Sequence, residues 1–181
     1  MNKQIEMTLR DVMRSGEVTR WHIVKTLRHQ SVAEHSFLVA MIAMRLCDVL
    51  EVDEKTKHDV LAYALMHDLP EVYMGDLPTP IKRMMGDDLC DKIEDFEGRI
   101  TFSGMSCNTP HDSTVGLIVK IADMLEAVAF LETNGHGTHA FAVQCQIREA
   151  ATAYGGKHAV GLIYELTQGL IQTLDDFKHE A

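Results

Sequence analysis

The prolines of this chain are few and concentrated, and their distribution limits the fold more than any other feature. Three of the four, Pro70, Pro78 and Pro80, lie within a segment of eleven residues. Because proline interrupts helices and central strands, the long stretches on either side are free to form regular structure. Apolar residues there recur at helical spacing, as at Ile5 and Leu9, without the alternation typical of strands. The pattern predicts an all-α fold.

We expect six or seven helices in one bundle-like domain over residues 1–181. Ser31 to Glu34 reads as a capping box that opens a helix through about Leu50. Asp53 opens the next helix, which breaks or kinks near Pro70. The other helices are expected at about 4–14, 86–103, 113–133, 138–154 and 158–178, with a loop over 75–80 and a break at 155–156. No pattern assigns the backbone of residues 18–29.

The charge balance restricts the partners of the chain. It has 17 Lys and Arg against 27 Asp and Glu, a formal net charge of -10. A broad basic face for nucleic acid or anionic lipid is therefore not expected, and an anionic ligand would need a local site. The four cysteines show no close spacing, and no apolar run is long enough to span a membrane. These features favour a reducing cytoplasm as the location.

Polar residues interrupt the apolar pattern at two places. His67 and Asp68 follow an apolar run over 60–66, at the depth where that helix should enter the core. A carboxylate buried there needs a salt bridge, a metal ion or another cation. A structural hydrogen bond between the two residues near a helix end is the simpler alternative.

The second interruption lies in the segment 117–131, where the polar positions are Lys120, Asp123 and Glu126. Steps of three residues align them in one stripe of an otherwise apolar helix. Such a stripe faces either a thin edge of solvent or an internal polar site.

His35 adds a third position of this kind, because it stands in the first turn of a helix that is mostly apolar. Taken alone it would be a capping or packing residue. Together with His67, Asp68 and Asp123 it completes two imidazoles and two carboxylates from three helices. This mixed set suits a divalent first-row transition metal, with coordination positions left for water and substrate.

The order His, His-Asp, Asp resembles the HD phosphohydrolase superfamily, and within it the branch of bacterial 5'-deoxynucleotidases and phage dATP triphosphohydrolases. The resemblance covers about residues 20–126. It rests on the following segments: Arg20-Trp21, 31–36 (SVAEHS), His67-Asp68, Glu71, 75–82 (GDLPTPIK) and 119–123 (VKIAD). Residues 138–178 match no motif and are assigned to packing or assembly.

The resemblance implies a site role for each matching residue. His35, His67, Asp68 and Asp123 would hold one metal ion, either Zn, Co, Mn or Fe. Glu71 would place and activate the attacking water. Its position four residues after His67 agrees with that role if helical geometry persists past Pro70.

The same resemblance implies the substrate contacts. Arg20, Lys82 and Lys120 would bind phosphate, and Thr79 would bond the substrate through its hydroxyl or backbone. Asp76 would bind the deoxyribose or assist Glu71. Trp21 would contact the nucleoside. Ile23 would crowd the 2-position of a purine, admitting adenine and hindering a 2-amino purine.

The resulting functional hypothesis is a hydrolase that attacks the α-phosphorus of dATP and releases deoxyadenosine and triphosphate. The alternative is a 5'-deoxynucleotidase that acts on dNMPs. A third hypothesis is a non-catalytic nucleotide-sensing module. We expect a small-molecule substrate, no nucleic acid polymer and no membrane. The resemblance also implies a homo-oligomer, a dimer or hexamer, in the cytoplasm, or in the host cytoplasm if the chain is phage-encoded.

Overall fold

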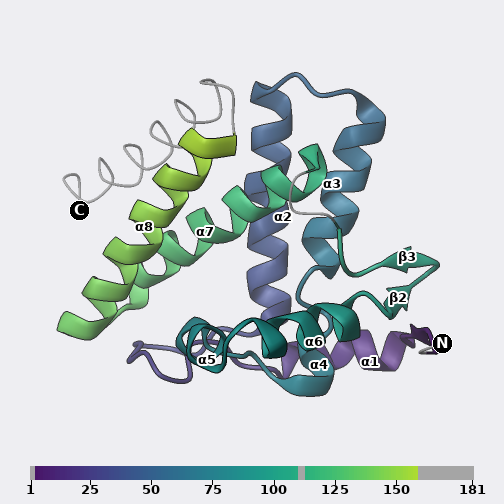
Figure 1. The fold of residues 1–181 in the computed structure, drawn as a ribbon. Coiled ribbons are helices and arrows are strands. Elements are labelled where there is room, and N and C mark those ends of the chain that lie inside the picture. Colours follow the sequence, from purple (N-terminus) through teal and green to yellow (C-terminus); the bar gives the residue numbers. More distant parts are fainter. Residues whose placement is uncertain (1–2, 110–112, 159–181) are drawn as a thin grey trace.

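Four long helices form the larger part of the molecule, and the shorter elements lie against one end of them (Figure 1). The computed structural model describes residues 3–109 and 113–158. Within these residues the helices are α1 (Leu9–Met13), α2 (Val32–Val49), α3 (Glu54–Met66), α4 (Glu71–Met74), α5 (Thr79–Met85), α6 (Asp87–Glu97), α7 (Thr114–Asn134) and α8 (Thr138–His158). A 3-10 turn, η1 (Arg14–Gly16), follows α1. The predicted helical fold is confirmed.

Helix α7 lies at the centre of the packing, where it contacts α2, α3 and α8. Leu125 and Ile121 of α7 are buried together with Val39 and Leu46 of α2 and Val60 of α3. Burial of each such side chain contributes roughly 1.5–3 kcal/mol. The apolar side chains around α7 therefore hold this helix in place between its neighbours. The positions of the polar residues on α7 are set in the same way.

Capping side chains explain where two of the long helices begin. Oγ of Ser31 accepts the Glu34 amide at 3.1 Å, and the carboxylate of Asp53 accepts the Thr56 amide at 3.0 Å, as the sequence predicts. The reciprocal half of the predicted capping box is not formed. The Glu34 carboxylate instead accepts a hydrogen bond from Arg28 at 2.9 Å, so it holds the preceding loop.

A small sheet departs from the prediction that the chain has no strands. Strand β1 (Ile5–Glu6) pairs in parallel with β2 (Ile100–Phe102), which pairs antiparallel with β3 (Met105–Ser106). The helix predicted over 4–14 therefore begins only at Leu9, and the one predicted over 86–103 ends at Glu97. Local spacing could not show this, because the strands are stabilised by pairing between distant segments and by burial of Ile100.

The chain turns sharply between α3 and α4, at the predicted break. α3 ends at Met66 with His67 as its C-cap, and α4 begins directly after Pro70. Two other boundaries differ from expectation. α5 already begins at Thr79, inside the predicted loop, and α8 continues through Gly155 and Gly156. The helix predicted over 158–178 lies almost wholly outside the described residues.

The segment between η1 and α2 folds back on itself as an irregular hairpin. The amide of Arg20 donates to the carbonyl of Gln30 at 2.9 Å, and Thr19 and Ser31 form an isolated bridge. A second bridge joins Thr26 to Gly135 after α7. These bonds bring Arg20, Trp21 and Gln30 together beside the start of α2.

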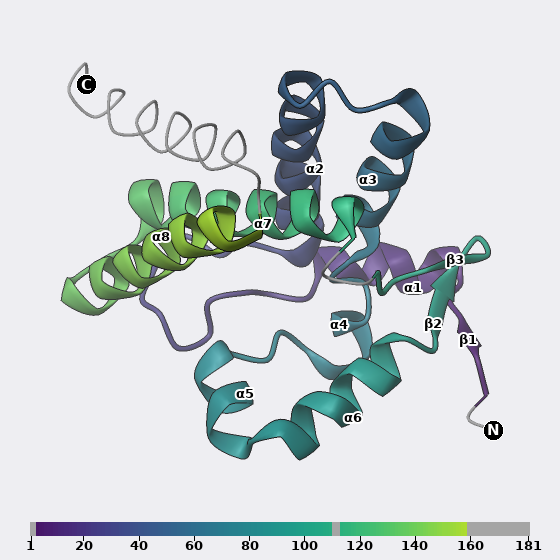
Figure 2. The ribbon, with the colours of Figure 1, turned by 45° about the horizontal axis from the view of Figure 1, so that its top comes forward.

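Two groups of elements face each other in Figure 2: α2, α3, α7 and α8 on one side, and α4, α5 and α6 on the other. A second apolar cluster, which includes Met66, Leu69, Val72 and Ile100, packs where they meet. The turn from His67 to Pro70 joins the two groups. Among the described residues, no helix is long and apolar enough to cross a membrane.

Candidate metal centre

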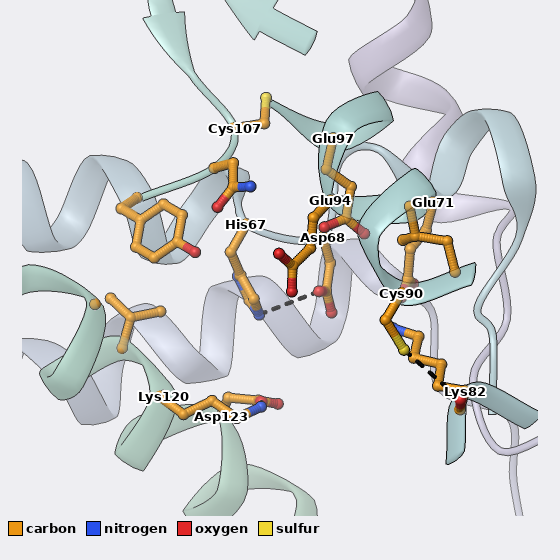
Figure 3. A pocket seen from close by; sticks show the side chains of 15 residues that line it. His67, Asp68, Glu71, Lys82, Cys90, Glu94, Glu97, Cys107, Lys120 and Asp123 are labelled. Atoms are coloured by element: carbon orange, nitrogen blue, oxygen red, sulfur yellow. Dashed lines mark hydrogen bonds and ion pairs between the residues drawn. The ribbon is translucent and has the colours of Figure 1, made fainter. Parts of the chain in front are cut away.

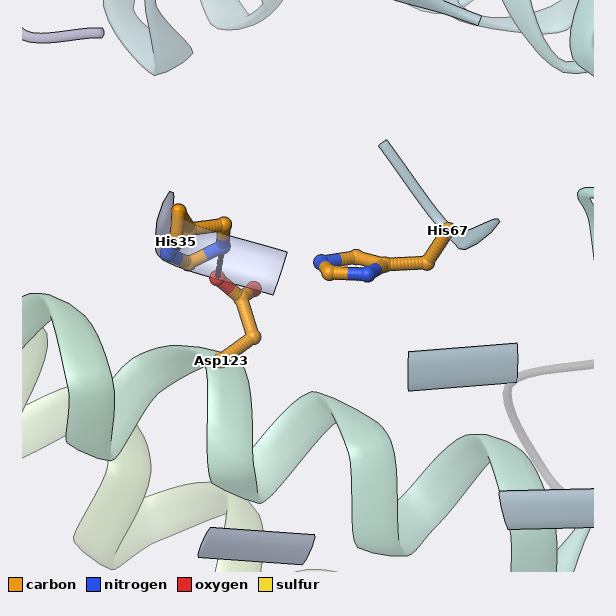
Figure 4. A group of neighbouring side chains, drawn as sticks. All are labelled: His35, His67 and Asp123. Carbon is orange, nitrogen blue, oxygen red and sulfur yellow. Dashed lines mark ion pairs between the residues drawn. The ribbon is translucent and has the colours of Figure 1, made fainter. Parts of the chain in front are cut away.

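Three of the four predicted metal ligands converge between α2, α3 and α7 (Figure 4). His35 comes from the first turn of α2, His67 from the end of α3 and Asp123 from the middle of α7. Each offers one ligand atom, and these atoms lie within 4.8 Å of one another. Nε2 of His35 is 3.3 Å from Oδ1 of Asp123. The structure thus gathers residues that are far apart in the sequence.

Asp68, the fourth predicted ligand, lies at the edge of the same group. Its Oδ2 is 3.4 Å from Nε2 of His35, and its Oδ1 is 3.5 Å from Nε2 of His67, the contact drawn as a dashed line in Figure 3. Successive side chains on a straight helix point about 100° apart. His67 keeps helical dihedral angles at the end of α3, yet the contact distances place one oxygen of Asp68 beside each imidazole.

The chemistry of the four side chains fits a transition-metal ion. Nε2 of His35 and Nε2 of His67 are both buried and lack a hydrogen-bond partner of good geometry. Imidazole nitrogens and carboxylate oxygens are the ligands that Zn²⁺ and related divalent ions take. Two buried nitrogens without hydrogen bonds, facing two carboxylates, are the arrangement expected where an ion supplies the missing interaction.

Both imidazoles are oriented through their other nitrogen. Nδ1 of His67 lies 2.8 Å from the carbonyl oxygen of Ala64, which can only accept a hydrogen bond. Nδ1 of His35 lies 2.6 Å from Oε2 of Glu126, which is itself buried. In the neutral form of each ring, a proton on Nδ1 leaves the lone pair on Nε2, directed toward the group of candidate ligands.

A buried hydrogen-bond chain continues from Glu126. Nε2 of Gln30 donates to Oε1 of Glu126 at 2.7 Å, and the indole Nε1 of Trp21 donates to Oε1 of Gln30 at 2.8 Å. The Trp21 ring stacks on Phe130 with 5.9 Å between centroids. Trp21 also has a φ of 66°, a left-handed backbone that bulky residues rarely adopt.

Two cations contact the carboxylates of the group. Nη1 of Arg20 is 2.6 Å from Oδ2 of Asp68, and Nζ of Lys120 is 2.7 Å from Oδ2 of Asp123. Nη2 of Arg20 also approaches Asp123 at 3.9 Å. Lys120, Asp123 and Glu126 therefore follow one face of α7 that lines an internal polar site, one of the two alternatives left by the sequence.

Burial and the neighbouring carboxylates together shift the pKa values of the two histidines in opposite directions. Burial opposes protonation of His35, but its contacts with Asp123 and Glu126 outweigh burial and raise its pKa to about 9. Burial lowers the pKa of His67, and the nearby Asp68 only partly offsets this. His67 therefore favours its neutral, ligand-competent form.

The carboxylates are shifted apart as well. Burial would raise the pKa of Asp123, but Lys120 and His35 hold it well below its ordinary value. Burial, together with Asp68 and Asp76, raises the pKa of Glu71 to about 9. Asp123 is thus strongly favoured as an anion, whereas Glu71 favours its protonated form. Carboxyl groups whose pKa values are shifted apart in this way are typical of sites with separate acid–base roles.

A cavity of about 300 Å³ opens beside the ligands (Figure 3). It lies between the end of α3, α6 and α7. Six residues predicted for the site line it: His67, Asp68, Glu71, Lys82, Lys120 and Asp123. Oε2 of Glu71 is buried without a hydrogen-bond partner. The cavity thus combines carboxylates with two lysines.

Other predicted site residues do not line this cavity. Arg20 bonds Asp68, and Trp21 bonds Gln30. The charge of Asp76 contributes to the raised pKa of Glu71. Ile23 is 53% exposed in the hairpin, and Thr79 is exposed at the start of α5. The structure therefore brings the predicted metal ligands, Glu71 and the lysines together but leaves the side chains of Ile23 and Thr79 at the surface.

Sequence reasoning missed several residues of the site. Gln30 is fully buried, yet it stands in a segment without periodicity, so no pattern singles it out. Glu94 and Glu97 of α6 line the cavity but read as exposed helix charges. Glu126 did carry a signal, because it lies three residues after Asp123 in an apolar helix and is 2% exposed.

A sequence model described as "5'-deoxynucleotidase YfbR-like" matches residues 9–101. The dATP triphosphohydrolase of Salmonella phage PMBT28 is 37% identical over 161 residues, which cover 84% of this chain and 80% of the relative. The 5'-deoxynucleotidase of Shewanella oneidensis is 30% identical over 142 residues, or 68% and 72% of the two chains.

The fold is similar to that of the cyanophage S-2L HD phosphohydrolase, a structure that contains dA and one catalytic Zn²⁺ ion. The two superpose with a TM-score of 0.78 at 25% sequence identity, and the match covers 98% of this chain and 99% of that chain. The likeness therefore extends over the helices that carry the ligands.

Proposed function

The chain belongs to the YfbR-like family of HD phosphohydrolases, and on that premise we propose that it is a metal-dependent hydrolase that attacks the α-phosphorus of dATP and releases deoxyadenosine and triphosphate. The observation that carries the proposal is the gathering of two buried imidazole nitrogens and two carboxylates beside a cavity that also contains Glu71 and two lysines. Relatives named as dATP triphosphohydrolases support the substrate.

In this proposal His35, His67, Asp68 and Asp123 hold one divalent transition-metal ion. A bound ion would act as a Lewis acid, lowering the pKa of water and neutralising phosphate oxygens. Zn²⁺ is the first candidate, because the similar cyanophage structure contains a catalytic Zn²⁺. The same ligands also suit Co, Mn and Fe.

Glu71 is proposed as the group that receives the proton of the attacking water. Its carboxylate lines the cavity with His67 and Asp68, and one oxygen has no hydrogen-bond partner. Without an ion, burial and the charges of Asp68 and Asp76 raise the pKa of Glu71 to about 9. A divalent cation held beside it would favour the ionised carboxylate that a general base needs. Asp76 would assist by its charge or bind the deoxyribose.

Lys82, Lys120 and Arg20 are proposed to neutralise the phosphates. Lys82 and Lys120 lie on different walls of the cavity, on α5 and α7, so a ligand bound in the cavity would have a lysine on each side. Arg20 bonds the carboxylate of Asp68, and we propose that it also contacts a phosphate of the bound substrate. Thr79, exposed at the start of α5, would contribute a hydroxyl or backbone contact at the rim.

The nucleoside end is proposed to lie near the hairpin that carries Trp21 and Ile23. Ile23 is 53% exposed, so its side chain is free to contact a ligand. If it crowds the 2-position of the purine, Ile23→Gly should improve hydrolysis of 2-aminoadenine deoxynucleotides relative to dATP. Equal ratios for the two proteins would argue against this role.

The second candidate is a 5'-deoxynucleotidase, favoured by the relative from Shewanella oneidensis and by the name of the matching family. The chemistry is the same but the phosphate tail is shorter. Purified protein with Zn²⁺, Co²⁺ or Mn²⁺ should be tested on all dNTPs and dNMPs, with nucleoside release followed by chromatography. A higher kcat/KM on dATP than on dAMP supports the first candidate, and the reverse supports the second.

A non-catalytic nucleotide sensor is the remaining alternative. It would bind deoxynucleotides in the same experiment without releasing nucleoside under any metal. The retention of Glu71 in the cavity argues against this role. We further propose a homo-oligomer that acts on the cytoplasmic deoxynucleotide pool, and light scattering of the purified chain tests the assembly.

A further inference from the structure

In the chain of hydrogen bonds from Trp21 to His35, the chemistry of each side chain fixes which group donates and which accepts. The indole N–H of Trp21 can only donate, and it donates to Oε1 of Gln30 at 2.8 Å. The orientation of the Gln30 amide is thereby fixed, and its NH₂ group donates to Glu126 at 2.7 Å. The second carboxylate oxygen of Glu126 is left to accept from Nδ1–H of His35 at 2.6 Å.

This directionality determines which nitrogen of His35 faces the other ligands. With Glu126 as an acceptor on both oxygens, the proton of a neutral His35 ring lies on Nδ1. The lone pair is then on Nε2, within 3.4 Å of Asp123 and Asp68. Gln30 and His35 are both fully buried, so water cannot replace a lost partner without cost.

The chain also connects His35 to the hairpin beside it. Arg20 and Trp21 are consecutive residues, and they reach the ligand group from two sides. Arg20 bonds the carboxylate of Asp68, whereas the indole of Trp21 bonds the chain behind His35. Trp21 has a left-handed backbone, its ring is supported on Phe130, and the Arg20 guanidinium lies over the same ring, 5.8 Å from its centroid.

We propose that Glu126 and Gln30 are positioning residues for metal binding. Together they select the coordinating nitrogen of His35 and transmit the state of the metal site to Trp21. Neither residue touches substrate or ion in this role. The inference rests on the proposed metal site, so its test must also distinguish a failure of that site.

The first measurement is the affinity of the metal-free full-length protein for Zn²⁺, determined by competition with a chromophoric chelator. The Glu126 carboxylate accepts from two donors, the Gln30 amide and Nδ1–H of His35. In Glu126→Gln the side chain has only one acceptor oxygen, so one of these two bonds must be lost. The affinity should fall roughly 10–100-fold, the range for partners of metal-bound histidines. Glu132→Gln is the matched control on the same helix, because Glu132 pairs with Arg148 of α8, away from the ligands. The zinc affinity of Glu132→Gln should match that of the wild type.

A swapped variant, Gln30→Glu with Glu126→Gln, separates hydrogen-bond direction from a general loss of packing. The indole would then donate to the new carboxylate at position 30. The amide at 126 would donate to that carboxylate and accept from His35 with its oxygen. Every donor in the swapped variant again meets an acceptor. Its zinc affinity should therefore be at least tenfold higher than that of Glu126→Gln, although each single change alone lowers the affinity.

Two further readouts follow the position of the proton and the connection to Trp21. The ¹⁵N chemical shifts of His35 should show an Nδ1–H tautomer in zinc-loaded wild type. Trp21 is the only tryptophan of the chain, so its fluorescence reports on this one ring. It should change during zinc titration of the wild type, and the change should be lost in Gln30→Leu while zinc still binds.

The outcomes separate the two proposals. Wild-type zinc affinity in Glu126→Gln, no recovery in the swapped variant, or an unchanged fluorescence response in Gln30→Leu would each overturn the positioning role. His35→Ala tests the site itself. If that variant binds zinc as tightly as the wild type, the proposed metal site fails. If it loses zinc while Glu126→Gln does not, only the positioning role fails.

Discussion

The guanidinium group of Arg20 lies 2.6 Å from the carboxylate of Asp68, and both side chains are largely buried, with 13% and 18% of their surface exposed. Arg20 also approaches Asp123, so one cation faces two carboxylates of the candidate metal centre. Arg20 and Lys120 each contact one of these carboxylates and offset part of their negative charge. Arg20 therefore serves stability as well as the proposed contact with phosphate.

Arg20→Met should destabilise the metal-free protein by roughly 3 kcal/mol, because it leaves a buried carboxylate without its partner. The loss should be smaller with Zn²⁺ present, since a bound ion compensates the same carboxylates. Urea unfolding with chelator and with zinc measures both values.

Arg28→Met is the matched control for that substitution. Arg28 pairs with Glu34 at the surface, where its side chain is 48% exposed, and an exposed pair contributes about 1 kcal/mol or less. Zinc should leave the effect of Arg28→Met unchanged. If both variants lose a similar amount of unfolding free energy, burial does not make the Arg20–Asp68 pair more stabilising than the exposed Arg28–Glu34 pair.

Glu71→Gln should reduce nucleoside release by roughly 10²–10⁴-fold, the usual contribution of general base catalysis. The amide keeps the size of the side chain but cannot take a proton from water. Zinc content, measured by elemental analysis, should stay near that of the wild type, because Glu71 is not among the proposed ligands. Retained activity, or loss of the metal, would contradict the assigned role.

The sequence predicts the ligands because each breaks a local pattern. His67 and Asp68 end an apolar run, and Asp123 interrupts an apolar helix, so spacing leaves an internal polar site as one of two alternatives. The combination with His35 and the resemblance to the HD phosphohydrolases favour a metal site. Helix starts at Ser31 and Asp53 are likewise local, since a capping side chain bonds an amide three residues away.

Features that depend on distant contacts could not be predicted in this way. Strand β1 has only two residues, and pairing of Ile5 with Ile100 forms its ladder. Gln30 gains its role from Trp21 and Glu126, which the irregular hairpin and α7 bring to it. Nothing in residues 18–29 indicates that hairpin, because its backbone is fixed by isolated bridges rather than by periodic packing.

The metal-free protein should lose stability as pH rises through the neutral range, in part because of Glu71. Its pKa is about 9 in the folded protein, against an ordinary value of 4.5. The folded state therefore binds the proton more tightly than the unfolded state between these values. The contribution of Glu71 is complete below about pH 4.5 and falls by at most about 1.4 kcal/mol per pH unit until about pH 9.

Glu71→Gln removes this dependence, because the amide does not titrate. In the presence of chelator, the stability of the variant relative to wild type should increase between pH 6 and pH 8, by roughly 2–3 kcal/mol at most. Urea unfolding at a series of pH values provides the comparison. Parallel curves for the two proteins would mean that the carboxylate is solvated and ionised in the folded state.

Zinc should stabilise the wild type against unfolding by an amount set by its affinity, about 2.7 kcal/mol when free zinc is a hundredfold above the dissociation constant. The stabilisation should largely disappear in His67→Ala, which removes one of the two buried imidazole nitrogens. His58→Ala is the control on α3, because that side chain is 74% exposed and pairs with the neighbouring Asp59. Calorimetry with zinc and with chelator measures all three proteins. If His67→Ala and His58→Ala respond to zinc alike, the ion binds elsewhere, and the convergence of His35, His67 and Asp123 has another purpose.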